Sequence, residues 1–510
     1  MDSTQDAEFL RQLARVNDAI AQRAAALSSL PTTSTPQLVS NAIDALPNDL
    51  PKTGLGIEAG GQAGPHYYGL VIGGVLPEAQ LADQLVTSYD PCVQVHFPEE
   101  SIAYIIEKQA LDMLLSLLSL PKSRFTSNTL TTGATASNLL GLVAGREATI
   151  ARVQKHRGVA SPSGLANWSV AEDGFGGIDV DIFTSSAHAS IAKAASLAGI
   201  GRRNVQDYTD VKDVHQPCAF DLKKLEESLR KNFGNTGSIV VTSFGEVNTG
   251  GVTPDSEKIR KLCDQYDGWL HCDAAFGAFA ALHPDFTHLS RQLACADSIT
   301  GDAHKWLNVP YDCGIFFSRS SFLLATCGPG QTSAAYLTAA PSTTTASPFP
   351  SIDPYRSTPS SLFQSIENSK RFRALPLYAA LISRGREGYA ELFARNIEFA
   401  RKMERWMREG GAGGAFEILT PTSETGDEEK KFRMMNIVLF GMSAKAPARF
   451  RVEGGGNVFA AEVNKGRKVY FTATSWRGRS AVRIAVSNWS TNLEEDFLWL
   501  VTALEEVIGT

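Results

Sequence analysis

The sequence predicts an α/β fold built around a largely parallel sheet, and two observations support this prediction. Between about residues 90 and 330, short apolar segments typical of buried strands alternate with segments of helical periodicity. Polar residues directly follow several of these apolar segments, as happens where ligands bind beyond the carboxyl ends of parallel strands. The predicted strands are 178–184, 238–244, 269–273, 298–300 and 314–318, and the predicted helices between them include 191–197 and 255–266.

The length of the chain and the order of its segments indicate more than one domain. A chain of 510 residues usually folds as two or three domains, and its composition is that of a globular protein. The Ser/Thr/Pro-rich segment 331–363 is long for a loop inside a compact enzyme, so it is either a lid or disordered, and we favour a lid. We expect a helical arm at 1–90, a large domain at 91–375 and a small C-terminal α+β domain at 376–510, with a long helical region at 366–409 and strand-like segments at 435–440, 469–472 and 482–486.

Charge, cysteine content and hydropathy exclude several classes of partner and location. A net charge of −6 without a basic run argues against nucleic acid as the main partner. No apolar stretch reaches transmembrane length, and the polar start, Met1 to Glu8, is unlike a secretory signal. The seven cysteines form no CxxC pair, which is typical of reduced thiols and not of disulfides or a zinc site. We expect a cytoplasmic protein that binds no metal, membrane or nucleic acid.

Two short motifs indicate a cofactor that carries an aldehyde. Asp273 ends a predicted strand in HCDAAFG (271–277), and Lys305 lies 32 residues later in TGDAHKWLNV (300–309). A lysine amine can bond covalently to an aldehyde, and a carboxylate can keep a pyridine nitrogen protonated. Pyridoxal 5′-phosphate requires both groups from the protein. The alternative, a surface lysine near a buried carboxylate, is disfavoured because two further matching motifs lie upstream.

The two upstream motifs supply groups for a phosphate and for a planar ring. In TTGATASNLL (131–140), backbone N–H groups at a helix start can face a phosphate, although an ordinary helix cap has the same pattern. In SSAHAS (185–190), His188 directly follows a predicted strand, where an imidazole can stack on a ring, although a lone histidine is more often structural. Asp302 and His304, beside Lys305, are candidates to bind the phosphate or to orient the lysine.

Together these motifs resemble the group II pyridoxal-phosphate-dependent decarboxylases, the family of the aromatic-amino-acid and glutamate decarboxylases. The resemblance runs from about Pro65 to the C-terminus. It implies the type I aminotransferase fold, with a large, mainly parallel seven-stranded sheet domain, and a homodimer with active sites at the subunit interface. The resemblance rests on TTGATASNLL, SSAH, HCDAAFG, DAHKWLNVPYDCG (302–314) and ENSKRFRALPLY (367–378).

The resemblance also implies roles for individual residues. Lys305 is similar to the Schiff-base lysine of the family, Asp273 to the partner of the pyridinium nitrogen, and His188 to the histidine that stacks on the ring. The phosphate falls at the start of the 134–140 helix, with His304 close by. The residues expected to bind the cofactor are Gly133, Ala134, Thr135, His188, Asp273, Ala275, Asp302, His304 and Lys305.

Two departures from the family pattern indicate a less characterised branch. The Gly-Thr-Thr run of many members is replaced by GEVNTGG at 245–251. Family decarboxylases use a lid tyrosine to protonate the substrate carbon, and the predicted lid offers Tyr336 and Tyr355, of which we choose Tyr355. Relatives that lack this tyrosine form an aldehyde in place of an amine.

We therefore expect decarboxylation of an L-amino acid to its amine. The alternatives are other reactions of the same cofactor, namely decarboxylative oxidative deamination to an aldehyde, transamination and carbon–carbon bond formation, and more remotely a non-catalytic partner subunit. The expected catalytic residues are Lys305, His188, Asp273 and Tyr355.

The substrate class has two interpretations. The aromatic residues of PHYYG (65–69) favour an aromatic amino acid, although they are equally typical of a core cluster. Arg356, Arg371 and Arg479 would suit an acidic side chain, although most arginines make surface pairs.

Overall fold

The structure, a computed structural model, describes residues 64–91, 93, 101–319, 361–421 and 432–509, and the single positions 14, 18 and 327. Contacts between residues divide the chain into two compact units. The expected domain boundaries at residues 90 and 375 stay a prediction. The first unit consists of Met1–Gly74, Lys402–Leu419 and Leu439–Thr510, and the second of Val75–Arg401 and Thr420–Val438.

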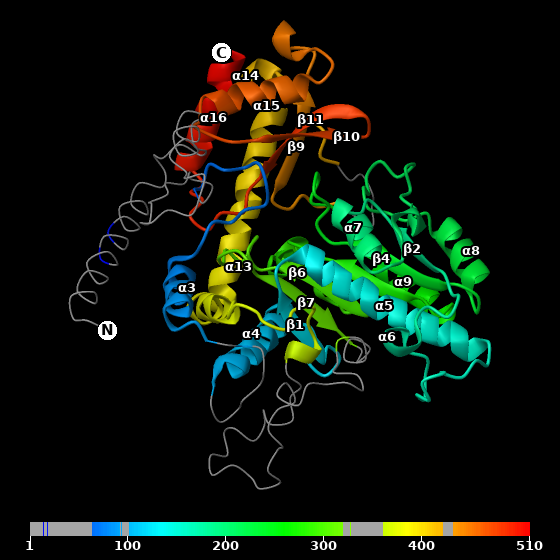
Figure 1. Ribbon diagram of the computed structural model, residues 1–510. Coiled ribbons are helices and arrows are strands. Elements are labelled where there is room, and N and C mark those ends of the chain that lie inside the picture. Colours follow the sequence, from blue (N-terminus) through cyan, green and yellow to red (C-terminus); the bar gives the residue numbers. More distant parts are fainter. Residues whose placement is uncertain are drawn as a thin grey trace, which may run out of the picture. The chain divides into compact units, whose positions relative to one another are not determined.

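The second unit contains a seven-stranded sheet in the order β1-β7-β6-β5-β4-β2-β3, which confirms the expected mainly parallel architecture (Figure 1). All neighbouring strands are parallel except β7, which is antiparallel to both β1 and β6. The strands other than β7 therefore end at the same edge of the sheet. Their bounds are β1 (Ser127–Thr131), β2 (Val180–Thr184), β3 (Val205–Asp207), β4 (Gly237–Ser243), β5 (Trp269–Asp273), β6 (Ser298–Asp302) and β7 (Gly314–Ser318).

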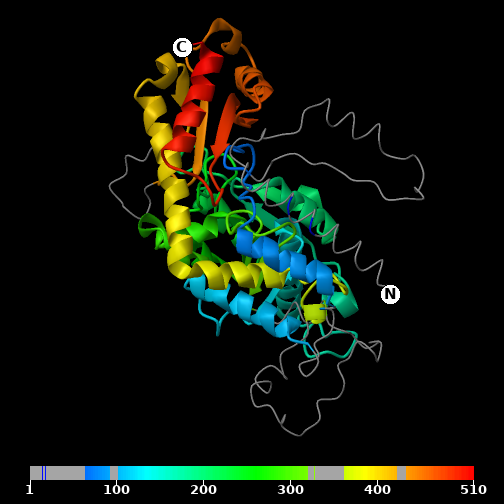
Figure 2. The same ribbon diagram turned by 90° about the vertical axis from the view of Figure 1, so that its left-hand side faces the viewer.

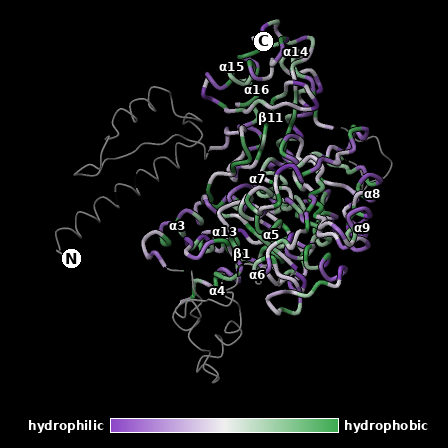
Figure 3. The backbone as a smooth tube through the Cα atoms, turned by 45° about the vertical axis from the view of Figure 1, so that its right-hand side comes forward, coloured by the Kyte–Doolittle hydropathy of each residue, from purple (hydrophilic) through white to green (hydrophobic). Residues whose placement is uncertain are grey.

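The helices of the second unit bury apolar faces. α5 (Ala134–His156) packs against β4, β5, β6 and β7, and its apolar residues share a core with Ile239 and Trp269. α8 (Leu222–Asn232) buries two leucines and exposes charged residues, so that Figure 3 colours it largely hydrophilic. The other α-helices of this unit are α3 (Pro77–Tyr89), α4 (Ala103–Leu117), α6 (Val170–Asp173), α7 (Ala189–Leu197), α9 (Ser256–Gln265) and α10 (Leu289–Leu293).

The long helix α13 (Ala374–Arg408) is bent (Figure 2). The bend lies at Gly385, where φ is 58° and ψ is −174°. This backbone conformation is essentially restricted to glycine, so the residue permits the change of direction. Short 3-10 helices cover Arg202–Asn204, Gly277–Leu282, Pro284–Phe286, Ser361–Phe363 and Ala448–Phe450.

The first unit contains a four-stranded sheet in the order β10-β11-β9-β8. The segment around Tyr68 is bonded to this unit, because its N–H donates to Tyr470 O at 2.9 Å and its carbonyl accepts from Ala485 N at 3.0 Å. The remaining elements are α14 (Gly411–Gly414), β8 (Phe416–Ile418), β9 (Ile437–Met442), α15 (Gly455–Lys465), β10 (Thr472–Trp476), β11 (Arg479–Ala485) and α16 (Glu495–Ile508).

The expected strand at 469–472 is wrong in position, since β10 covers Thr472–Trp476. The reason is the tight turn that follows β10. Arg477 and Gly478 both have positive φ, 49° and 77°, and Trp476 pairs with Arg479 across the turn. Two such residues form a hairpin turn, which places the paired strand directly before them.

In the part of the chain that the structure describes, no helix combines the length and the apolar character needed to cross a membrane. A cytoplasmic location stays a prediction.

Candidate active site

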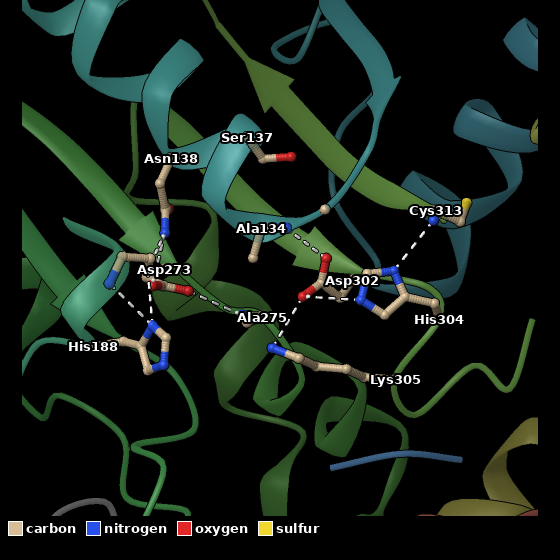
Figure 4. A network of polar contacts seen from close by, with 12 residues as sticks. Ala134, Ser137, Asn138, His188, Asp273, Ala275, Asp302, His304, Lys305 and Cys313 are labelled. Atoms are coloured by element: carbon tan, nitrogen blue, oxygen red, sulfur yellow. Dashed lines mark hydrogen bonds and ion pairs between the residues drawn. The ribbon is translucent and has the colours of Figure 1, made fainter. Parts of the chain in front are cut away.

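The candidate site lies at the edge of the seven-stranded sheet where its parallel strands end (Figure 4). Asp273 is the last residue of β5, and Asp302 is the last residue of the neighbouring strand β6. Lys305 follows β6 by three residues, and His188 follows β2 as the N-cap of α7. The parallel order therefore collects at one edge four side chains that lie far apart in the sequence.

Asp302 connects Lys305 to the first turn of α5. Its Oδ2 lies 2.9 Å from Lys305 Nζ, and its Oδ1 accepts the N–H of Ala134 at 2.6 Å. The Asp302 side chain is buried, whereas 25% of the Lys305 side chain is exposed. The carboxylate is therefore compensated by a cation inside the protein, and the amine of Lys305 keeps access to a ligand.

His304 packs beside Asp302 as a neutral imidazole. Its Nδ1 accepts the N–H of Cys313 at 3.2 Å, and its Nε2 lies 3.6 Å from Asp302 Oδ2. Burial lowers the pKa of His304, which favours the uncharged ring. The Tyr311 ring covers it with a centroid separation of 4.2 Å.

In the part of the chain that the structure describes, the hydrogen bonds to the Asp273 carboxylate come from neutral donors. Asn138 Nδ2 donates to Asp273 Oδ2 at 3.0 Å, and the N–H of Ala275 donates to Oδ1 at 3.2 Å. The carboxylate is 8% exposed. Because these donors carry no charge, they fix the carboxylate without neutralising it.

Asn138 is a residue that sequence reasoning missed. It is fully buried on α5, and its Oδ1 lies 2.9 Å from Nε2 of the fully buried His271. Its Nδ2 also donates to Ser190 Oγ at 3.1 Å, and that hydroxyl lies 2.9 Å from His188 Nδ1. Asn138 thus joins the carboxylate of Asp273 to the ring of His188. The TTGATASNLL motif contains Asn138, but the motif alone does not indicate which residues this side chain contacts.

The start of α5 has the geometry expected of an anion-binding turn. Gly133 has a φ of 153°, and a Cβ there would lie 3.4 Å from His304 Cε1. The first N–H groups of a helix have no acceptor inside the helix, and the dipole favours a negative charge near them. The N–H of Ala134, one of the residues expected to bind the phosphate, is directed to Asp302 Oδ1.

Gly314 is a second residue that the sequence analysis missed. A Cβ at this position would lie 2.6 Å from Gly133 Cα and N. The close approach of β7 to the turn before α5 therefore requires glycine here.

Several predicted residues lie elsewhere. Tyr355, Tyr336 and Arg356 fall outside the described residues. Arg371 pairs with Asp83, and Arg479 pairs with Glu417 through both carboxylate oxygens.

The aromatic residues proposed for the substrate pocket pack within the first unit. Tyr67 stacks on Tyr470 at 4.9 Å, and Tyr68 stacks on Phe471 at 6.0 Å. Both tyrosines are buried, at 5% and 1% exposure. These contacts are those of a core cluster, which was the alternative interpretation of PHYYG.

The residues of this edge fit pyridoxal 5′-phosphate. Lys305 supplies a primary amine on a partly exposed side chain, and Asp273 supplies a carboxylate whose described hydrogen bonds come from neutral donors. The turn at Gly133 leads into helix N–H groups suited to a phosphate. Amine, carboxylate and anion-binding turn are the three groups that this cofactor needs from a protein.

Comparisons with known proteins agree with this geometry. Residues 65–427 match the family model of the pyridoxal-dependent decarboxylase conserved domain. The L-2,4-diaminobutyrate decarboxylase of Acinetobacter baumannii is 24% identical over 336 residues, which are 65% of this chain and 60% of that protein. Tryptophan decarboxylase 1 of Oryza sativa subsp. japonica is 24% identical over 425 residues, which are 80% of this chain and 74% of that protein.

Solved structures share the fold. The crystal structure of Rhodiola rosea 4-hydroxyphenylacetaldehyde synthase has a TM-score of 0.78 at 20% identity, over 99% of this chain and 98% of that one. The Oryza sativa TDC structure with PLP and tryptamine also has a TM-score of 0.78 at 20% identity, over 100% of this chain and 99% of that one. The family match covers most of the chain and includes every cofactor-binding residue expected from the sequence, and its cofactor is pyridoxal phosphate; the chain belongs to the pyridoxal-dependent decarboxylase family.

Proposed function

We propose that this chain removes the α-carboxyl group of an L-amino acid as CO2 and releases the amine. The observation that carries the proposal is the placement of Lys305 and Asp273 at the ends of neighbouring parallel strands, in a chain that matches the decarboxylase family over residues 65–427. Bound pyridoxal phosphate supplies a ring that accepts the electron pair left when a bond to the α-carbon breaks. The protein holds that ring and orients the reacting bond.

Lys305 attaches the cofactor through Nζ. Asp302 holds this nitrogen at 2.9 Å, so that the amine has a fixed position before the cofactor enters. The amine of a flexible lysine side chain forms a covalent bond to an aldehyde efficiently only when the amine is held in position. The Asp302 carboxylate also attracts the ammonium form of Lys305.

Asp273 acts on the nitrogen of the cofactor ring, and His188 acts on the face of that ring. The uncompensated carboxylate of Asp273 favours the protonated state of a pyridine nitrogen, because an opposite charge nearby stabilises the charged form. His188 is exposed at the start of α7 and covers the face of the ring. The N–H groups of Thr135 and Ala136 bind the phosphate, which fixes the third point of the cofactor.

Tyr355 is proposed as the residue that protonates the α-carbon after CO2 leaves. We also propose that two copies of the chain form a homodimer with active sites at the interface, as the family resemblance implies. Sedimentation of the cofactor-loaded protein at several concentrations tests the dimer, and Tyr355→Phe tests the tyrosine through the ratio of amine to aldehyde.

Aldehyde formation is the second candidate function. It is favoured by the 31% identity over 140 residues to the 4-hydroxyphenylacetaldehyde synthase of Rhodiola rosea, although this match spans only 27% of the chain. Such a reaction consumes oxygen and releases ammonia together with CO2, whereas decarboxylation to the amine consumes no oxygen.

One experiment separates these functions. Purified protein loaded with pyridoxal phosphate is incubated with L-tryptophan, L-tyrosine, L-2,4-diaminobutyrate and L-glutamate in turn, and CO2, amine, aldehyde and oxygen are measured. Equal amounts of CO2 and amine with no oxygen uptake support the proposal. Oxygen uptake with aldehyde supports the second candidate, and release of no CO2 from any amino acid contradicts both.

A further inference from the structure

A continuous chain of hydrogen bonds leads from the buried core to His188. Trp269 Nε1 donates to Ser298 Oγ at 3.0 Å, and that hydroxyl lies 2.8 Å from His271 Nδ1. His271 Nε2 lies 2.9 Å from Asn138 Oδ1. The chain continues from Asn138 through Ser190 to His188, with a branch to Asp273. Asn138, His271 and Ser298 are fully buried, so water does not replace these partners.

The orientation of the Asn138 amide is fixed by Asp273. A carboxylate can only accept hydrogen bonds, so the atom of Asn138 that lies 3.0 Å from Asp273 Oδ2 is the NH2 group. The same NH2 group donates its second proton to Ser190 Oγ. The amide oxygen is therefore directed at His271 Nε2, and it can only accept.

His271 must then carry its proton on Nε2. Burial lowers the pKa of His271 to about 4, so the ring is neutral and has a single N–H. With that proton on Nε2, the Nδ1 atom accepts the hydroxyl proton of Ser298. The Ser298 oxygen accepts in turn from Trp269, whose indole nitrogen can only donate. The protons of His271, Ser298 and Trp269 then each have one position, and Thr300 Oγ1, 3.4 Å from His271 Nε2, can accept from the same ring N–H.

The same reasoning assigns the proton of His188. Ser190 Oγ accepts from Asn138 and lies 2.9 Å from His188 Nδ1, so that its own proton can point to that nitrogen. The backbone N–H of Ser190 donates to the same ring nitrogen at 3.2 Å. A ring nitrogen that accepts a backbone N–H carries no proton, so the N–H of a singly protonated His188 ring lies on Nε2, on the far side from Ser190.

We propose that His271 and Asn138 are positioning residues that together hold the carboxylate of Asp273 and fix His188 as the Nε2–H tautomer, so that His188 offers a hydrogen-bond donor to the bound substrate. The catalytic consequence rests on the function proposed above. His271 contributes through its shape and its N–H, and neither residue needs to contact the substrate. An anionic oxygen of the substrate, such as a carboxylate oxygen, can accept a hydrogen bond from this donor.

The packing of α5 around His271 supports a dedicated role for this ring. A Cβ at Gly141 would lie 2.3 Å from His271 Cε1 and 2.4 Å from Nδ1. Gly141 therefore leaves the space that the imidazole occupies, at the cost of a glycine inside a helix, where alanine is preferred by about 1 kcal/mol. Helix and strand are thus both adapted to the position of His271.

The first test is the protonation of the ring nitrogens in the wild-type protein loaded with pyridoxal phosphate. Nitrogen NMR of protein labelled at histidine distinguishes a protonated from an unprotonated ring nitrogen, and the signals of His188 and His271 are assigned from His188→Asn and His271→Gln. We expect Nε2–H and an unprotonated Nδ1 for both rings at pH 7.5. The Nδ1–H form of either ring in the wild-type protein would overturn the inference.

The second test compares His271→Gln with His271→Leu. Glutamine can donate an N–H to Asn138 Oδ1, whereas leucine leaves that oxygen without a donor and allows the amide to rotate. We expect His271→Leu to give a mixture of His188 tautomers and to lower kcat about tenfold, with KM within twofold. We expect His271→Gln to keep most of the Nε2–H tautomer of His188 and most of the wild-type kcat. Equal behaviour of the two variants would overturn the inference.

Gly141→Ala provides the test if His271→Leu does not fold. This variant removes no polar group and displaces the ring, so we expect the same mixture of His188 tautomers. An unchanged tautomer would contradict the proposal. If the wild-type tautomers are as expected but no amino acid releases CO2, the proposed function fails while the assignment of His188 stands.

Discussion

Two carboxylates end neighbouring strands of the sheet, and the protein holds them in opposite ways. Asp302 is paired with the ammonium of Lys305 at 2.9 Å, so its charge is compensated within the chain. Asp273 is held by the amide of Asn138 and the N–H of Ala275, which are neutral. Both side chains are buried, at 2% and 8% exposure. Equal burial with unequal compensation indicates that the two carboxylates have different tasks.

The difference follows from what a buried charge requires. A carboxylate with an internal cation gains little from a second one, whereas a carboxylate held only by neutral donors still attracts a positive charge. Asp273 therefore favours a cationic ligand, as a protonated pyridine nitrogen is. Asp302 positions groups of the protein, namely Lys305 and the first turn of α5.

Replacing Lys305, the cation that compensates Asp302, has the largest expected effect on CO2 release. Lys305→Ala removes the amine that attaches the cofactor and leaves Asp302 without its cation. We expect the visible absorbance of bound cofactor to disappear and the rate of CO2 release to fall by at least about a thousandfold, or about 4 kcal/mol in the barrier. Lys193→Ala, at an exposed lysine of α7, is the control and should change neither. A retained absorbance band in Lys305→Ala would show that another group holds the cofactor.

Acid should lower the stability of the protein through the protonation of His271, whose ring contacts Asn138 beside Asp273. Its pKa is lowered to about 4 by burial, while an unfolded histidine has a pKa of about 6.5. Between these values the unfolded chain binds the extra proton, so stability falls as the pH falls through this window, by about 3 kcal/mol in total. The melting temperature measured from pH 7 to pH 4 should fall less steeply for His271→Gln than for the wild type. Parallel curves would contradict the assignment.

Asp273→Asn removes the charge and one oxygen acceptor on its side of the comparison. Asparagine keeps the size of the side chain and an oxygen for the N–H of Ala275, but it offers Asn138 no second acceptor and no longer stabilises a protonated pyridine nitrogen. We expect kcat to fall about a hundredfold, or about 2.7 kcal/mol in the barrier, with a small change in cofactor affinity. Single-turnover rates and the pH titration of the cofactor absorbance measure this effect. An unchanged kcat would contradict the role of Asp273.

The sequence predicted the strands of the site because their residues are apolar and buried, as in β5, which was predicted with its observed bounds. It missed β1, whose residues Ser127–Thr131 are fully buried but mostly polar, so no apolar run was present. Lys305, Asp273 and His188 could be found because Asp273 ends a predicted strand and the other two lie within a few residues after one. Asn138 and His271 lie 133 residues apart, and their contact exists only after the sheet has formed.

The contacts that the residues of each motif make could also not be predicted from the sequence. Asp302 was expected to bind the phosphate or to orient the lysine, and the structure places its carboxylate on Lys305 Nζ and on the N–H of Ala134. Tyr67 and Tyr68 were expected either in a substrate pocket or in a core cluster, and periodicity cannot separate these. Their stacking on Tyr470 and Phe471 is set by chain segments some 400 residues away.

Asp302→Asn tests the other carboxylate and has the smallest expected effect. Asparagine has one oxygen acceptor, so it can serve Lys305 or Ala134 but not both, and it does not compensate the ammonium. We expect the dissociation constant of pyridoxal phosphate to rise about tenfold, or about 1.4 kcal/mol, while kcat of the loaded enzyme changes by less than threefold. Asp273→Asn should show the reverse, a lower kcat with nearly unchanged affinity. If both variants changed affinity and kcat in the same proportion, the two carboxylates would share one task, and the difference in their partners would have no functional meaning.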